Sequence, residues 1–210
     1  MLLRSQQAHV AATLLNPSAR GVFFLTGNAG TGKTFLARYI LHKLRQTGRV
    51  ACAGSTGIAA QRFSKYAHTA HRMFSLPSSS VKINWNPNKP QSRIIVHSRV
   101  WMIDEISMLS SHLLDAFVTI MSHATNVWGG QLSDLLQHKL VIFIGDLCQL
   151  PPVCPHRVPM WNAPSVSFCA GCHVTSSRIW QHTRRIMLTE PMRHSTDPRF
   201  TALLDLSRTA

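Results

Sequence analysis

The chain has 210 residues, 45% of them hydrophobic, which predicts one compact domain with its own core and excludes a disordered polypeptide. No apolar run is long enough to cross a bilayer, and the first ten residues lack the apolar core of a secretion signal, so we expect an intracellular protein. The formal net charge of +14 lies wholly in residues 1–103, which contain Lys and Arg but no Asp or Glu, and this favours a nucleic-acid partner over a merely soluble surface.

The first predicted strand leads directly into a glycine-rich loop. Residues 21–26 (GVFFLT) precede residues 27–34 (GNAGTGKT), and a helix is predicted over residues 34–44. In this context the N–H groups of the loop and the helix N-terminus surround the phosphates of a nucleotide. Lys33 is expected at the β- and γ-phosphates, and the Thr34 hydroxyl on Mg²⁺. The candidate nucleotide-binding residues are Gly27, Asn28, Ala29, Gly30, Thr31, Gly32, Lys33 and Thr34.

The second predicted strand, residues 50–55 (VACAGS), ends where another helix begins. Ser55, Thr56 and Gly57 stand at this junction, and their hydroxyl and amide groups can donate to the phosphates of a nucleic acid. We therefore expect these three residues to contact a DNA strand.

A short helix is predicted around His71 and Phe74, which are three residues apart and can face a DNA strand together. His71 is expected to face the strand. For Phe74, stacking on a base and packing in the core are nearly equal alternatives. The following residues, 75–92, are rich in Ser, Pro and Asn and are predicted to form a long surface loop.

A pair of carboxylates ends the next predicted strand, residues 99–104 (RVWMID). Asp104 and Glu105 are the first two acidic residues of the chain. Asp104 would hold Mg²⁺, and Glu105 would polarise the attacking water as a general base. The alternative is an acidic strand end without a role. A hydrolase needs such a base, whereas a kinase passes the phosphoryl group to an acceptor and has no need of it.

Two more strands are predicted at residues 140–146 (LVIFIGD) and 185–190 (RIMLTE), after a helix over residues 110–121. Gln149 follows the first of these strands, where it can bond the γ-phosphate or the lytic water, or simply belong to a turn. Strands that alternate with helices predict an α/β fold, with a mostly parallel sheet covered on both faces and its ligands beyond the carboxyl ends of the strands.

The five cysteines do not suggest a disulfide framework. Several lie with histidines in or beside a proline-punctuated segment, residues 151–172, that is predicted to be a loop. Ordinary thiols are favoured here over a zinc site, because no second well-spaced pair is present. The residues concerned are Cys154, His156, Cys169, Cys172 and His173.

Taken in order, these motifs resemble those of the Pif-one family of superfamily-one DNA helicases. The resemblance is carried by GNAGTGKT, STGIAA with HTAHRMF, WMIDEISML, GDLCQLPPV and LTEPMR. It implies a P-loop NTPase with a RecA-like sheet, ATP and Mg²⁺ as cofactors, and unwinding of DNA in the 5′-to-3′ direction. It also implies that Gln7, in LRSQQ, contacts the adenine base and that Arg193 is an arginine finger at the γ-phosphate. This chain has Gln6 where the family usually has Glu.

The resemblance covers residues 1–210 but only about the N-terminal half of the family's two-lobed motor. It implies a single RecA-like ATPase lobe, with single-stranded DNA, duplex junctions and a second lobe, in cis or in trans, as partners. A helix over residues 197–208 resembles the last element of that lobe. The alternatives are a non-enzymatic nucleotide- and DNA-binding remnant and, more remotely, a small-molecule kinase. The family works in genome maintenance in the nucleus or mitochondrion, or in viral or mobile-element replication.

Overall fold

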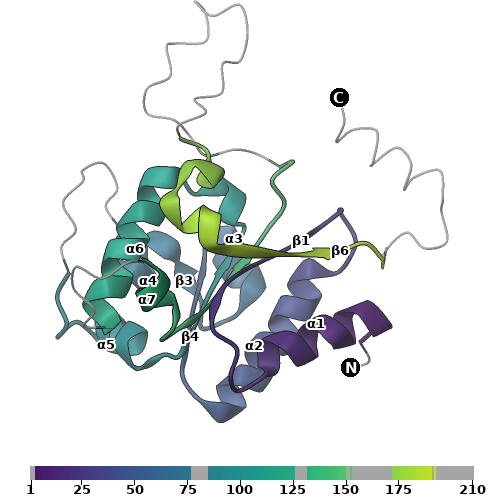
Figure 1. Cartoon of the computed structure of the whole chain (residues 1–210), viewed down its shortest axis with the longest axis horizontal. Coiled ribbons are helices and arrows are strands. Elements are labelled where there is room, and N and C mark those ends of the chain that lie inside the picture. The colour runs from purple at the N-terminus through teal and green to yellow at the C-terminus, as the bar shows by residue number, and fades with distance from the viewer. Residues whose placement is uncertain are drawn as a thin grey trace, which may run out of the picture.

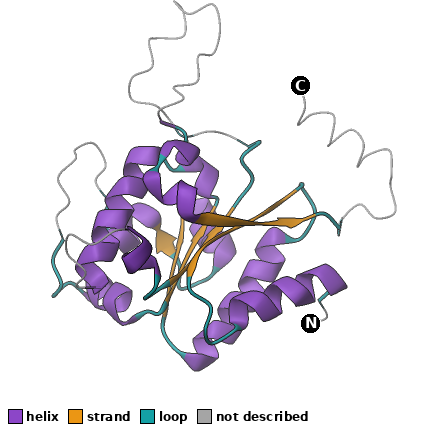
Figure 2. Ribbon diagram, in the orientation of Figure 1, coloured by secondary structure: helices purple, strands orange, loops and turns teal. Residues whose placement is uncertain are grey.

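Parallel strands form one sheet at the centre of the structure, which is a computed structural model that describes residues 3–76, 85–125, 132–149, 152, 172–190 and 192. The strands lie in the order β3-β2-β4-β5-β1-β6, and each neighbouring pair is parallel (Figure 2). The predicted α/β fold with a parallel sheet is therefore confirmed. The strands are β1 (Gly21–Gly27), β2 (Val50–Gly54), β3 (His68–Thr69), β4 (Val100–Asp104), β5 (Leu140–Ile144) and β6 (Thr183–Leu188).

Helices cover both faces of this sheet (Figure 1). Helices α1 and α2 contribute to the core on one face, and α4, α5 and α6 contribute to the core on the other. Short 3-10 helices, η4 (Val174–Ser176) and η5 (Arg178–His182), lead into β6. The α-helices are α1 (Ser5–Leu15), α2 (Lys33–Thr47), α3 (Gly57–Phe63), α4 (Ala70–Phe74), α5 (Pro90–His97), α6 (Ser111–Thr125) and α7 (Leu132–Leu136).

Strand β1 shows how one apolar run supplies both cores. Successive side chains of a strand point to opposite faces of the sheet. Val22 and Phe24 accordingly belong to the core beneath α4, α5 and α6, whereas Phe23 and Leu25 belong to the core beneath α1 and α2. A strand that is buried on both faces needs a continuous apolar sequence, and this is why such runs predicted the strands well.

The two helices predicted from apolar periodicity are present. The helix predicted over residues 34–44 is α2, which ends before Gly48 and buries Leu36, Ile40 and Leu44 on the side that faces the sheet. The helix predicted over residues 110–121 is α6, and it extends four residues further. In both cases the spacing of three or four residues between apolar side chains identified the buried face.

The predicted loop over residues 75–92 is wrong at its C-terminal end, because α5 begins at Pro90. Proline suits the first turn of a helix, where its missing N–H would have had no partner in the helix. The C-terminal end of α5 is held from a distance, since the Lys139 ammonium donates to the carbonyls of Val96 (3.0 Å) and Ser98 (2.8 Å). The composition of residues 75–92 gives no indication of this contact, because Lys139 lies in a distant part of the sequence.

Two further expectations fall largely or wholly on residues outside those described. The predicted loop over residues 151–172 is represented by Pro152 and Cys172 alone, and the predicted helix over residues 197–208 is not represented. In the part of the chain that the structure describes, no helix combines the length and the hydropathy of a membrane span.

Candidate functional site

The glycine-rich loop lies between β1 and α2 at the carboxyl edge of the sheet. Gly27, Gly30 and Gly32 have positive φ angles of 154°, 81° and 81°, which side chains with a Cβ rarely adopt. Space is also limiting. A Cβ at Gly27 would run into the carbonyl oxygen of Leu188, and a Cβ at Gly32 would lie 2.7 Å from Nε2 of Gln7. Glycine is therefore required at both ends of the loop for its shape and for its neighbours.

Lys33 begins α2 and turns its ammonium back over the loop. Its Nζ donates to the carbonyl oxygens of Gly27 (2.8 Å) and Asn28 (3.1 Å). The Thr31 hydroxyl donates to the same Asn28 carbonyl at 2.8 Å. These bonds keep the positive charge at the mouth of the loop, where an anionic group would meet it together with the helix N-terminus. Thr34, the next residue of α2, is half-buried.

Asp104 and Glu105 end β4 on the same edge of the sheet. The Asp104 side chain is buried, with 3% of its surface exposed, and its Oδ1 accepts a hydrogen bond from the Glu105 N–H at 3.0 Å. Glu105 has φ 54° and ψ 47°, a left-handed conformation that is uncommon for residues other than glycine. The backbone therefore turns sharply directly after Asp104.

Burial, and to a smaller extent the neighbouring Glu105 charge, raise the pKa of Asp104 to about 7, against the opposing effects of the hydrogen bond from the Glu105 N–H and of the Lys33 charge. The influence of Lys33 places its ammonium within electrostatic reach of the Asp104 carboxylate. The structure therefore brings together the three predicted residues Lys33, Asp104 and Glu105. A buried carboxyl whose proton is held this firmly is suited to a site that a cation enters.

Strand β5 ends beside this pair. Asp146 is buried, and its Oδ1 accepts the Cys148 N–H at 3.1 Å, while the Asp146 carbonyl accepts the Gln149 N–H at 3.1 Å. These bonds form a turn that leaves the Gln149 side chain exposed. The Asp146 carboxylate thus shapes the turn that presents Gln149, a role that its place at the end of the strand did not indicate.

Gln7 lies against the glycine-rich loop. It is 3% exposed, and its Nε2 donates to the Thr31 carbonyl at 3.3 Å, while its Oε1 accepts the Arg4 N–H at 3.4 Å. The structure thus places the predicted base-contacting residue at the loop and engages both ends of its carboxamide within the protein.

The preceding residue, Gln6, ties α1 to the end of β6, a role that the sequence did not reveal. Its Nε2 donates to the Met187 carbonyl (3.0 Å) and to the Thr189 hydroxyl (3.3 Å), and its Oε1 accepts the N–H groups of Thr189 (3.0 Å) and Glu190 (3.4 Å). A carboxamide supplies both the donor and the acceptor that this strand end requires, whereas a carboxylate could not donate to Met187. The sign of this role in the sequence is Gln6 itself, because the family that the sequence resembles usually has Glu at this position.

The chain beyond β6 returns to the glycine-rich loop, because the Met192 N–H donates to the Gly30 carbonyl at 2.8 Å. Arg193, the predicted arginine finger, is the next residue and lies outside the described part of the chain. Its position therefore stays a prediction.

The residues predicted to contact a DNA strand lie on α3 and α4 or beside them. The Thr56 hydroxyl accepts the Ala59 N–H at 3.1 Å and caps α3. The Ser55 hydroxyl is buried and has no hydrogen-bond partner within the described residues, and Gly57 is exposed with open space in front of it. His71 is half-buried on α4. Because the Thr56 hydroxyl acts here as an acceptor, its proton is still available to donate, and Ser55, Thr56, Gly57 and His71 all remain candidates.

The predicted base-stacking role of Phe74 is wrong. Phe74 is fully buried, and its ring packs edge-on against Phe117 with centroids 4.8 Å apart and against Trp101 at 6.0 Å. A short helix has a buried face and an exposed face, and the two-residue pattern did not reveal which of them Phe74 occupies. Burial of this large apolar ring in the aromatic core decides its orientation.

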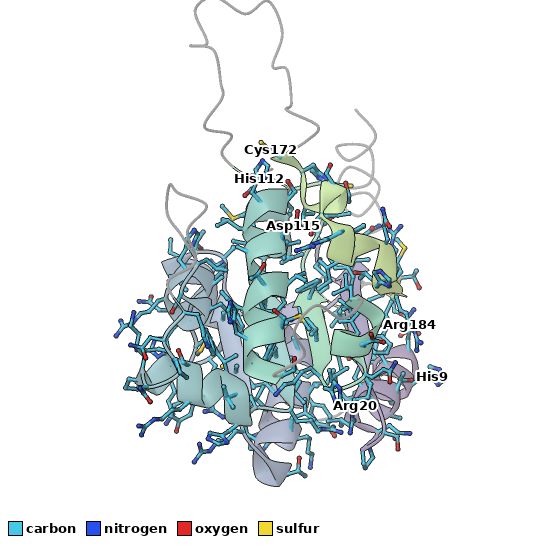
Figure 3. The ribbon with its side chains drawn as sticks, turned by 60° about the vertical axis from the view of Figure 1, so that its left-hand side comes forward. His9, Arg20, His112, Asp115, Cys172 and Arg184 are labelled. Atoms are coloured by element: carbon cyan, nitrogen blue, oxygen red, sulfur yellow. The ribbon has the colours of Figure 1, made fainter. Side chains whose placement is uncertain are left out.

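Of the residues considered for zinc, the structure describes Cys172 and His173. Cys172, labelled in Figure 3, is buried. Nδ1 of His173 lies 2.7 Å from the Thr175 hydroxyl. Cys154, His156 and Cys169 lie outside the described residues. Within the described ranges, no three potential ligands come together as a metal site.

Comparisons with known proteins agree with this geometry. A family model described as PIF1-like helicase matches residues 2–202. The chain is 32% identical over 212 residues to the ATP-dependent DNA helicase PIF1 of Emericella nidulans and 30% identical over 199 residues to that of Homo sapiens. These alignments cover 96% and 89% of this chain but 26% and 28% of the two relatives, so the chain spans roughly a quarter of their length.

Solved structures show the same fold. The crystal structure of Pif1 helicase from Candida albicans superposes with a TM-score of 0.78 at 30% identity and covers 99% of this chain and 44% of the other. A Bacteroides Pif1 helicase in complex with ADP-AlF3 and single-stranded DNA superposes with a TM-score of 0.77 at 24% identity, and it covers 100% of this chain and 47% of the other. The sheet and its helices are thus those of one RecA-like half of such proteins.

Proposed function

The chain belongs to the PIF1-like helicase family, and from that membership we propose that residues 1–210 form the first RecA-like motor lobe of an ATP-dependent DNA helicase that moves 5′ to 3′. The observation that carries the proposal is the meeting of three groups at one edge of the sheet: the glycine-rich loop, the Lys33 ammonium and the Asp104–Glu105 pair. The whole activity requires a second lobe, in cis or in trans, since the chain spans roughly a quarter of the length of its curated relatives.

The residues present fit ATP with Mg²⁺. The glycine-rich loop can surround a phosphate because Gly27 and Gly32 carry no side chain and so let the backbone lie close against its neighbours. Lys33 would then donate to phosphate oxygens in place of the loop carbonyls. Asp104 and Thr34 would hold the Mg²⁺, which supplies charge neutralisation at the transferred phosphoryl group when it is bound. The raised pKa of Asp104 supports this assignment, since an incoming cation offsets the cost of ionising a buried carboxyl.

Glu105 acts as the general base toward the attacking water, from the sharp left-handed turn that follows Asp104. Gln149 orients the same water or bonds the γ-phosphate from the exposed turn after β5. Gln7, which already contacts the loop at Thr31, reads the adenine base, and Arg193 follows Met192, which contacts the loop at Gly30. A stabilising arginine at the γ-phosphate acts where charge develops during transfer.

The same edge of the sheet offers a strand-binding surface next to the nucleotide site. The Ser55 N–H donates to the Asp104 carbonyl at 3.0 Å. This backbone hydrogen bond joins a proposed DNA-contact residue directly to the proposed Mg²⁺ ligand. We assign Ser55, Thr56, Gly57 and His71 to the DNA strand, and single-stranded DNA and duplex junctions as the substrates. Work on genomic DNA in the nucleus or mitochondrion fits the eukaryotic relatives.

The test of this proposal is the Lys33→Ala variant of the 210-residue chain. Loss of the ammonium that faces the phosphates should abolish ATP binding in an isothermal titration with Mg²⁺. Lys43→Ala, an exposed lysine on the same helix, is the matched control and should bind ATP as the parent does. Equal ATP affinity in the parent and in Lys33→Ala would remove the nucleotide assignment.

A non-enzymatic remnant is the second candidate, because the chain spans roughly a quarter of its curated relatives. The discriminating variant is Glu105→Gln in the chain joined to a second lobe. A helicase lobe should keep its ATP affinity and lose turnover, whereas a remnant would show no turnover to lose.

A further inference from the structure

An exposed tyrosine on the basic half of the chain holds two cations against its ring. Tyr66 is 54% exposed, the Arg45 guanidinium carbon lies 4.0 Å from its ring centroid, and the Lys65 Nζ lies 5.0 Å from the same point. We call Arg45, Lys65 and Tyr66 the Tyr66 cluster. Neither the glycine-rich loop nor the residues assigned to the DNA strand include any of its members.

Local hydrogen bonds set the Tyr66 cluster in place. Arg45 comes from the last turn of α2. Lys65 and Tyr66 are the two central residues of a turn closed by the Ala67 N–H on the Ser64 carbonyl at 2.9 Å, and the Ser64 hydroxyl accepts the Tyr66 N–H at 3.2 Å. Because two elements distant in sequence meet on one ring, the cations are positioned before any ligand arrives, which lowers the entropic cost of binding one.

The charges of the Tyr66 cluster have no acidic counterpart. Residues 1–103 contain no Asp or Glu, and the ion pair found in the described residues, Arg178 with Asp115, lies on other elements. Their distances to the shared ring centroid place the two cations closer together than the Debye length of about 10 Å at 0.1 M salt, so they repel each other. An anion at this point would relieve that repulsion.

The chemistry of the cluster selects phosphate groups rather than bases. A guanidinium that stacks on an aromatic ring keeps its N–H groups free at its edge, in the planar arrangement that matches phosphate oxygens. The ring itself contacts cations, so it is less suited to stacking on a base. A lipid surface fits less well, because Tyr66 is the large exposed apolar side chain of the cluster, and insertion into a membrane needs several.

Helix α3 connects the Tyr66 cluster to the proposed DNA contacts. It begins at Gly57 and ends at Phe63, just before the turn that holds Tyr66. Its seven residues span about 10 Å along the helix axis, a distance that a single DNA strand covers within a few nucleotides. A strand that leaves Gly57 along α3 therefore reaches the cluster.

We propose that Arg45 and Lys65, held on the Tyr66 ring, bind the phosphates of single-stranded DNA a few nucleotides beyond the contacts at Ser55 and Gly57. This inference rests on the proposed function, because that function places the strand at the start of α3. It adds a site that extends the footprint of the lobe on DNA.

The experiment measures binding of the 210-residue chain to fluorescent oligothymidylates by anisotropy over a range of NaCl concentrations. The double variant Arg45→Ala/Lys65→Ala should reduce the slope of log K against log [salt] by about 1.4, because each cation contributes roughly 0.7 for single strands. The gain in affinity with oligonucleotide length should also end at a shorter length than in the parent. ATP affinity should stay unchanged.

The matched control is Lys89→Ala/Arg93→Ala, which removes one exposed lysine and one exposed arginine at α5. Its slope should equal that of the parent, and a reduction equal to that of the cluster variant would overturn the inference in favour of diffuse attraction. An unchanged slope in the cluster variant would overturn the inference while the proposed function stands. Absence of DNA binding by the parent would overturn both.

Tyr66→Leu separates positioning from charge, since it removes the ring and keeps both cations. It should weaken binding while the salt slope is retained, and unchanged affinity would overturn the role of the ring. Vesicles with anionic lipid supply the last arm. If binding to these vesicles depended on the cluster while DNA binding did not, the assignment to nucleic acid would be wrong.

Discussion

At the scale of single residues, the ionisation of Asp104 links the stability of the lobe to its ligand. An unfolded chain ionises this carboxyl near its ordinary pKa of about 4, whereas the folded chain holds the pKa at about 7. Between these two pH values the unfolded state has released its proton and the folded state has kept it. The stability of the nucleotide-free lobe therefore falls as the pH rises through this window, and this cost persists above it.

We therefore predict that Asp104→Asn raises the free energy of unfolding of the nucleotide-free chain at pH 8, because the buried negative charge is gone, and that the gain shrinks toward pH 4. Urea denaturation at a series of pH values measures it. Asp134→Asn, at an exposed position on α7, serves as the control and should show no such pH-dependent gain. A gain in Asp104→Asn that is the same at pH 4 and pH 8 would contradict the pKa.

Some residues of the site could be found from the sequence and others could not, and the reason is the range of their contacts. Lys33 and Asp104 stand at fixed positions in short motifs, so spacing alone located them. The hydrogen bonds of Gln6 join residues more than 180 positions apart, such as Gln6 and Thr189. No local sequence pattern indicates such a partner. Phe74 fails for a related reason, since its environment consists of side chains from β4 and α6.

At the scale of elements, Phe74 shows that a helix assigned to DNA contacts can also be part of the core. Helix α4 turns Met73 and Phe74 into the apolar layer and leaves Arg72 exposed and His71 half-buried. The helix is thus anchored by one face while the other is available to a ligand. Substitutions on the buried face of α4 should therefore change the stability of the fold, whereas substitutions on its exposed face should change ligand binding.

We predict that Phe74→Ala lowers the free energy of unfolding by about 3–5 kcal/mol, because it opens a cavity beside Trp101 and Phe117. DNA affinity per folded molecule should remain that of the parent. His71→Ala should show the reverse, with weaker DNA binding and little change in stability. Urea denaturation and anisotropy with single-stranded DNA measure the two quantities. A Phe74→Ala chain with parental stability and weaker DNA binding would restore the stacking role.

The sequence was most informative for strands and least informative for polar helices. Strand β4 was predicted within one residue of its bounds, because a strand covered on both faces must be apolar throughout. Helix α5 was missed because Pro, Asn and Ser around its start are typical of loops. Its formation depends on Ile95 in the core and on the distant Lys139 ammonium, which are tertiary contacts.

At the scale of the whole molecule, the net charge is concentrated in one half of the sequence, whereas the apolar core is divided between the two faces of the sheet. The cores on the two faces of the sheet are comparably apolar, yet the net charge of +14 comes from the first half of the sequence. In the described part of the chain, the ion pair between Arg178 and Asp115 belongs to the second half and is largely exposed. Mutual repulsion among the remaining cations therefore opposes folding at low ionic strength.

We predict that NaCl stabilises the ligand-free chain, and that the melting temperature rises between 0.05 and about 0.5 M salt as the repulsion is screened. Differential scanning calorimetry measures the change. The Arg45→Ala/Lys65→Ala variant should respond less than the parent, because it lacks one repelling pair. A melting temperature that falls as NaCl is added would show that attractive ion pairs, not repulsion, dominate the surface.

The strand order also governs how the chain can acquire its shape during synthesis. Strand β1 leaves the ribosome early, but its hydrogen-bonded neighbours β5 and β6 end near residues 144 and 188. At translation rates of about 5–20 residues per second, β1 waits roughly 8 to 30 s for its second neighbour. Until β5 has been made, this apolar segment is unpaired on both edges, and until β6 has been made it is unpaired on one, so the glycine-rich loop, which contacts Leu188 at the end of β6, cannot take its final form before then.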